Sequence, residues 1–125
     1  MKVFRRVTQD PRQALGISGE DLACAELVRR GYAILERRYR TRHGEIDIVA
    51  RDGDTLVFVE VKVKVTEEFG TAAEAVTRRK QRRVASMAAE YLARNRLSEV
   101  ACRFDVVAID GEVLTLIRDA FAVGG

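Results

Sequence analysis

Three acidic side chains and two lysines stand at alternate positions in two neighbouring segments rich in Val and Ile, as Glu45 and Asp47 in the first and Glu60, Lys62 and Lys64 in the second. Residues two apart on a β-strand share a face, so the charges of each segment would lie on one side. Crowded carboxylates destabilise a sheet and raise one another's pKa values. A bound divalent cation would reverse that cost. The spacing favours a metal site, although a solvated outer face of a hairpin explains the same alternation.

The two segments, residues 44–50 and 55–64, are predicted to form a β-hairpin. The turn Arg51-Asp52-Gly53-Asp54 joins them, and Asp-Gly is a strong signal for a short hairpin turn. With the Asp-Gly pair as the tight turn, position 45 would lie opposite position 60, and position 47 would lie diagonal to it. This register would bring the three carboxylates and a lysine within side-chain reach.

The composition predicts a globular, cytoplasmic protein. The 125 residues are 47% hydrophobic, enough for the core of one domain. No apolar run reaches the length of a membrane span, and the N-terminus is too polar for a secretory signal. Cys24 and Cys102 are expected to be buried free thiols, and two cysteines with one histidine cannot build the usual structural zinc site. The net charge of +3 permits a polyanionic partner without requiring one.

A first helix is predicted to start at Ser18, which forms a capping box with Asp21, and to end before Gly31. Its apolar stripe consists of Cys24, Leu27 and Val28, with Ala23 at the edge. Glu20 falls on the same stripe, one turn from the start of the helix. An inward carboxylate could belong to the acidic site, although the helix dipole also stabilises a Glu in the first turn.

A short strand is predicted at residues 32–36, followed by a basic segment around Tyr39. The basic side chains are Arg37, Arg38, Arg40, Arg42 and His43. They could form a solvated edge that discourages aggregation. They could equally contact phosphates, with Tyr39 packing on a base or sugar.

A second, longer helix is predicted to run from a capping box at Thr71–Glu74 to about Asn95. Its buried face consists of Val76, Lys80, Val84, Met87, Ala88 and Tyr91. Within this stripe, Lys80 is placed to approach the acidic face of the hairpin. The exposed flank carries Arg78, Arg79, Arg82 and Arg83, whose like charges at i,i+4 cost the helix stability. A polyanion would offset that cost, and a solvated basic face is the alternative.

Two further strands are predicted at residues 103–109 and 113–117, joined by a turn at Asp110-Gly111. Strands interleaved with two helices indicate an α/β fold in which helices pack on a mixed sheet. Residues 1–15 are expected to be a basic, irregular lead-in to a domain at 16–118, and residues 119–125 a tail.

Several short motifs follow one another along the chain. They are Gly19-Glu20, Gly31-Tyr32, Gly44-Glu45-Ile46-Asp47, Phe58-Val59-Glu60-Val61-Lys62, Phe69-Gly70, Ala75-Val76, Lys80 and Arg103-Phe104-Asp105-Val106-Val107. This ordered set resembles the PD-(D/E)XK nuclease superfamily, and more closely the YraN-like family of uncharacterised bacterial proteins.

The resemblance implies a restriction-endonuclease-like αβββαβ core, with a mixed central sheet flanked by helices, as in Holliday-junction resolvases. It implies that Asp47 and Glu60 bind Mg²⁺ or Mn²⁺ and that Lys62 is the lysine of the catalytic motif. Glu20 matches the glutamate that the resolvase branch carries on its first helix, where it could hold a metal-bound water or a second ion. Glu45 belongs to the signature of the family and is a further candidate metal ligand.

The implied activity is a metal-dependent endonuclease on nucleic acid, with structured or branched DNA favoured over RNA. The residues expected to hold the phosphate backbone are Arg40, Arg42, Lys64, Arg78, Arg79, Lys80, Arg82 and Arg83. A resolvase-like activity would favour a two-fold homodimer, because a four-way junction presents two related scissile sites. The alternatives are a nucleic-acid-binding protein that keeps the nuclease fold without catalysis, and an adaptor whose acidic face meets a basic protein.

Overall fold

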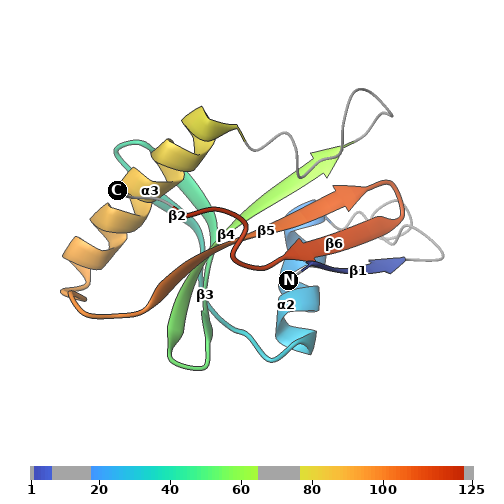
Figure 1. Cartoon of the computed structure of the whole chain (residues 1–125), viewed down its shortest axis with the longest axis horizontal. Helices are drawn as coiled ribbons and strands as arrows, with labels where there is room; N and C mark the ends of the chain where they lie inside the picture. The colour runs from blue at the N-terminus through green and yellow to red at the C-terminus, as the bar shows by residue number, and fades with distance from the viewer. Residues whose placement is uncertain (1, 7–17, 65–76, 123–125) are drawn as a thin grey trace.

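The computed structural model describes residues 2–6, 18–64 and 77–122, which form one mixed sheet and two helices (Figure 1). The elements are β1 (Lys2–Arg6), α2 (Gly19–Arg29), β2 (Ala33–Thr41), β3 (Gly44–Asp52), β4 (Thr55–Lys64), α3 (Arg78–Arg94), β5 (Cys102–Asp110) and β6 (Val113–Ile117). From α2 to β5 this order is αβββαβ, which confirms the predicted fold class.

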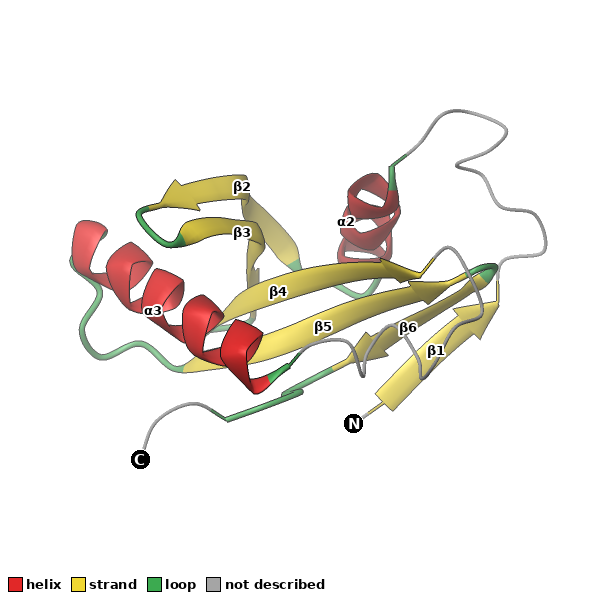
Figure 2. Ribbon diagram, turned by 90° about the horizontal axis from the view of Figure 1, so that it is seen from above, coloured by secondary structure: helices red, strands yellow, loops and turns green. Residues whose placement is uncertain are grey.

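The described strands form a six-stranded sheet in the order β1-β6-β5-β4-β3-β2. Strands β4 and β5 are parallel, whereas the other neighbouring pairs are antiparallel. Parallel neighbours need a long crossover, and α3 lies in the connection between β4 and β5 (Figure 2). The central strand β4 therefore has a hairpin partner on one side and a crossover partner on the other.

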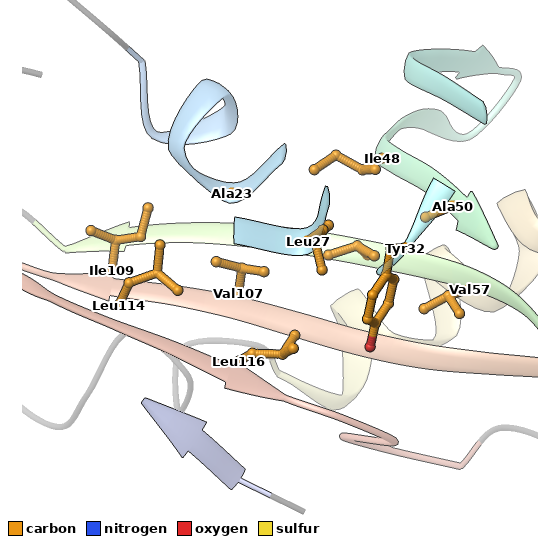
Figure 3. Packing of buried hydrophobic residues seen from close by; sticks show 11 residues of the cluster. Ala23, Leu27, Tyr32, Ile48, Ala50, Val57, Val107, Ile109, Leu114 and Leu116 are labelled. Carbon is orange, nitrogen blue, oxygen red and sulfur yellow. The ribbon is translucent and has the colours of Figure 1, made fainter. Parts of the chain in front are cut away.

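Helices α2 and α3 cover opposite faces of this sheet. Along β4, Val57 and Val59 pack into the cluster that contains α2, whereas Leu56 and Phe58 pack into the cluster that contains α3. Figure 3 shows the α2 side, where Leu27 lies against strand residues. Because β4 is buried on both faces, its apolar residues form a nearly continuous run, as is typical of a parallel central strand.

The ends of α2 lie where the sequence predicts. The Ser18 hydroxyl accepts a hydrogen bond from the Asp21 N–H at 3.1 Å, and the Ser18 N–H donates to the Asp21 carboxylate at 3.3 Å. The predicted apolar stripe is wrong at Val28, whose side chain is 56% exposed. Instead, Glu26 is buried on this helix, in ion pairs with Arg29 and Arg30.

Both ends of the described chain add to the sheet or its packing. Residues 2–6, which the sequence analysis placed in an irregular lead-in, form β1 and pair with β6 (Figure 2). Residues 119–122, expected to be a tail, pack on β5: the Asp119 N–H donates to the Asp105 carboxylate, and the Phe121 ring stacks on Phe104. Both cysteines are free, but neither is fully buried as predicted, since Cys24 is half-buried and Cys102 is exposed.

Helix α3 begins at Arg78, later than predicted. Thr77 is the N-cap, with an extended backbone and a side chain that accepts a hydrogen bond from the Lys80 N–H. The expected capping box at Thr71–Glu74 and the expected stripe residue Val76 lie outside the described residues. The rest of the predicted buried face is confirmed for Val84, Met87, Ala88 and Tyr91.

Both helices end in the same hydrogen-bond pattern, but with different residues at its left-handed position. At the end of α2, Gly31 has φ +93° and Tyr32 N–H donates to Leu27 O. At the end of α3, Arg96 has φ +55° and Leu97 N–H donates to Leu92 O. Glycine adopts this conformation without steric cost, whereas a residue with a Cβ is strained there.

We therefore expect Arg96→Gly to raise the free energy of unfolding by about 1 kcal/mol, because it removes the strain of a left-handed residue. Urea denaturation followed by circular dichroism measures the change. Ala93→Gly, at an exposed position inside the same last turn, is the matched control and should lower the stability by about 1 kcal/mol. Equal losses in the two variants would contradict the assignment of strain to Arg96.

Candidate functional site

The register of the β3–β4 hairpin differs from the prediction by two residues. Asp52 pairs with Thr55, so the turn is Gly53-Asp54, and Ile48 pairs with Val59. The next residues along the ladder are Asp47 and Glu60, which therefore oppose each other; position 45 does not face position 60. Asp52 stays in the ladder because its carboxylate accepts hydrogen bonds from distant arginines, Arg103 of β5 and Arg118 after β6.

Asp47 and Glu60 form a carboxyl pair at the centre of the sheet. The Asp47 carboxylate accepts a hydrogen bond from the Val61 N–H at 2.8 Å. Glu60 is only 3% exposed. Its pKa is raised to about 8, first because of burial and then because it hydrogen-bonds to Asp47 and is repelled by that negative charge. At neutral pH the protein alone therefore keeps a proton on this pair.

Basic side chains of α3 adjoin the carboxyl pair. The Lys80 Nζ lies 3.7 Å from a Glu60 oxygen, which confirms that Lys80 approaches the acidic face of the hairpin. The positive charges of Lys80 and Arg83 lower the Glu60 pKa, but less than burial and Asp47 raise it. Lys62 follows two residues after Glu60 on β4 and is half-buried. The site thus combines two acids with nearby cations from the sheet and a helix.

The other two candidate acids have separate partners. Glu45 forms an ion pair with Arg40, because the β2–β3 register places these residues opposite each other. Glu20 accepts hydrogen bonds from Arg37 and Arg38. Within residues 2–6, 18–64 and 77–122, no group of three or more His, Cys, Asp or Glu side chains is arranged to hold a metal ion.

The basic segment before the hairpin lies on the edge strand β2, as the solvated-edge alternative expects. Arg42 is exposed and hydrogen-bonds to Glu90 of α3. The Tyr39 ring packs edge-to-face on Tyr91 at 4.9 Å, and its hydroxyl accepts from Arg94. This packing argues against Tyr39 as a platform for a base.

The helix arginines remain open to solvent. Arg78, Arg79, Arg82 and Arg83 are all exposed on α3. The Lys64 side chain lies outside the description of the structure, so its predicted contact stays a prediction. The first half of α3 therefore presents a row of exposed basic side chains.

The model of the uncharacterised protein family UPF0102 matches residues 19–109. The chain belongs to this family. A UPF0102 protein of Ralstonia pickettii is 50% identical over 88% of this chain and 91% of its own length. A UPF0102 protein of Syntrophus aciditrophicus is 48% identical over 93% of both chains. Within the described residues, no helix is both long and apolar enough to cross a membrane.

A buried polar network of this UPF0102 protein was not predicted from the sequence. Asp105 is fully buried and accepts hydrogen bonds from the Tyr32 hydroxyl at 2.7 Å and from Arg103 Nε at 2.9 Å. Arg103 also reaches Asp52 at the end of the hairpin. The signal that could have revealed it is an acidic residue inside the otherwise apolar strand 104–109. The network fixes the hairpin that carries the candidate site.

The raised Glu60 pKa predicts a specific dependence of stability on pH. An unfolded glutamate titrates near pH 4.5 and the folded one near pH 8, so between these values only the folded state holds the proton. Stability from this group is present below pH 4.5 and is lost as the pH rises towards 8, by at most about 1.4 kcal/mol per pH unit.

We expect Glu60→Gln, which stays neutral and keeps a hydrogen-bond donor, to flatten this decline. Urea unfolding of both proteins in EDTA from about pH 5 to about pH 8.5 tests this expectation, because that range covers most of the interval between the two pKa values. Parallel curves for the two proteins would show that Glu60 is ionised normally in the folded state.

Proposed function

We propose that this UPF0102 protein is a metal-dependent endonuclease that hydrolyses phosphodiester bonds in nucleic acid, with branched DNA as its first candidate substrate. The observation that carries the proposal is the pair of half-buried Asp47 and buried Glu60 in the sheet, flanked by Lys80. Burial of two carboxyls against each other costs stability, and a cation bound between them would offset that cost. We place this activity in the cytoplasm.

The donor set fits Mg²⁺ or Mn²⁺. Magnesium is commonly held by one or two carboxylates and completes its shell with waters and substrate phosphates, so Asp47 and Glu60 suffice as protein ligands. When bound, such a cation would supply a hydroxide-like nucleophile and relieve the negative charge on the phosphate. Carboxylate ligation requires that Glu60 release the proton it shares with Asp47.

The side chains around the pair have distinct roles in this proposal. The Val61 N–H fixes the Asp47 carboxylate, so this ligand is already oriented. Lys80 lies against Glu60 and would stabilise its ionised form. Lys62 would position the attacking water or offset the charge that develops on the phosphate. The exposed arginines of α3 would hold the backbone of the substrate by charge-assisted hydrogen bonds.

One contact favours a second candidate, a nucleic-acid-binding protein without catalysis. The Lys80–Glu60 ion pair and the shared proton already satisfy the buried carboxyl pair without a metal. The exposed arginines of α3 would bind phosphates in either case. This candidate predicts salt-sensitive binding of nucleic acid that survives the loss of Asp47.

Calorimetric titration with Mn²⁺ or Mg²⁺, with and without a short DNA duplex, tests the metal site. We expect Asp47→Asn and Glu60→Gln to abolish binding and to reduce any Mg²⁺-dependent cleavage of a four-way DNA junction by about 100-fold or more. Glu45→Gln is the matched control, because it removes a carboxylate two residues from Asp47 that pairs with Arg40 instead.

Three outcomes separate the candidates. Metal binding that Asp47→Asn removes, together with cleavage, supports the endonuclease. Junction binding without metal binding or cleavage, unchanged in Asp47→Asn, supports the non-catalytic protein. A protein that binds neither metal nor nucleic acid contradicts both.

A further inference from the structure

We propose that Arg37 and Arg38 of β2 form a phosphate-binding site that the Glu20 carboxylate occupies in the free protein. The Arg37 Nε lies 3.1 Å from Glu20 Oε1, and the Arg38 Nε lies 3.2 and 3.3 Å from the two oxygens of that carboxylate. Guanidinium groups that converge on one oxyanion provide the donors that a phosphodiester also accepts. Glu20 would thus compete with a phosphate of the nucleic acid for the two arginines. This inference rests on the proposed nucleic-acid function.

The strand register places these arginines on the edge strand, next to the strand that carries Asp47. Strands β2 and β3 pair through Arg37–Ile48 and Tyr39–Ile46, so the intervening residues are Arg38 and Asp47. Neighbouring strands are about 4.8 Å apart, so the Arg38 backbone is one strand from Asp47 and two from Glu60. The two arginines contact α2 and Glu60 contacts α3, so the two sites lie on opposite faces of the sheet near its β2 edge.

The backbone at Arg38 supports a role beyond strand formation. Arg38 has φ +53°, a left-handed conformation that costs free energy for a residue with a Cβ. In the described pairing of β2 with β3, Arg37 and Tyr39 have partners on β3, whereas Arg38 is not paired. Such strain concentrates at functional positions, because the surrounding structure must hold it in place. Here the unusual backbone directs a guanidinium onto the carboxylate of another element.

The ion pairs are accessible and exchangeable. The Arg38 and Arg37 side chains are 64% and 40% exposed, whereas Glu20 is 15% exposed. Exposed ion pairs are weak, so a phosphate that arrives with its neighbours can displace a single carboxylate. Arg37 also contacts Asp21 at 2.7 Å, which would keep this side chain in place during the exchange.

The test separates this role of Glu20 from a metal-ligand role, because EDTA removes metal ions from the binding reaction. The test is binding of a fluorescently labelled four-way DNA junction in EDTA at several salt concentrations. We expect Glu20→Gln to tighten DNA binding by about three- to tenfold, because the two arginines no longer have to release a carboxylate before they bind a phosphate. We expect Arg38→Gln to weaken binding and to reduce the slope of log K against log salt by about 1.

Two controls separate this site from a general charge effect. Asp54→Asn removes the same charge in the exposed turn six residues from Glu60, roughly 20 Å along β4, and should change binding far less than Glu20→Gln. Arg51→Gln removes an exposed arginine near that turn and should leave the salt slope nearly unchanged. In an Arg38→Gln background, Glu20→Gln should lose most of its effect.

The outcomes are distinguishable from failure of the proposed function. If the wild-type protein binds no nucleic acid, the proposed function fails and this site fails with it. If the wild-type protein binds but Glu20→Gln binds equally or more weakly, this inference alone is overturned. An equal gain from Asp54→Asn, or an undiminished gain in the Arg38→Gln background, also overturns it.

Discussion

The register of the β3–β4 hairpin is the constraint on which the candidate site depends. A shift of two residues would replace Asp47 by Glu45 opposite Glu60, with the same faces of the strands still buried. The choice is made at the far end of the hairpin, where Asp52 stays in the ladder and accepts hydrogen bonds from Arg103. A buried ion-pair network on β5 thereby decides which two acids meet.

Two carboxyl groups that meet inside the sheet, Asp47 on β3 and the buried Glu60 on β4, lower the stability of the fold. Neighbouring groups offset part of this cost. Burial and the charge of Asp47 favour the neutral form of Glu60, whereas Lys80 and Arg83 favour the ionised form. The protein alone therefore keeps a proton on this pair at neutral pH, whereas further positive charge beside it would favour the ionised form. A strand that only contributed to the core would gain more from an apolar residue at position 60.

Charge pairing sorts the basic surface into two regions. Arg40 on β2 and Arg42 in the turn after β2 each have a carboxylate partner, and Arg37 and Arg38 pair with Glu20. The first half of α3 instead presents exposed arginines. A polyanion would meet the helix arginines first and would reach β2 only by exchange with carboxylates.

The sequence by itself determined the elements from α2 to β6 and their order, because their signals act within a few residues. The Ser18 capping box and the helical spacing of the α3 core appear where expected. Tertiary structure decided the hairpin register, the proton on Glu60, the separate partners of Glu20 and Glu45, and the addition of β1 to the sheet. The physical reason is that register and charge pairing depend on groups far apart in the chain. Asp52 meets an arginine of another strand, and Glu20 meets arginines beyond the end of its own helix, so no local pattern specifies either contact.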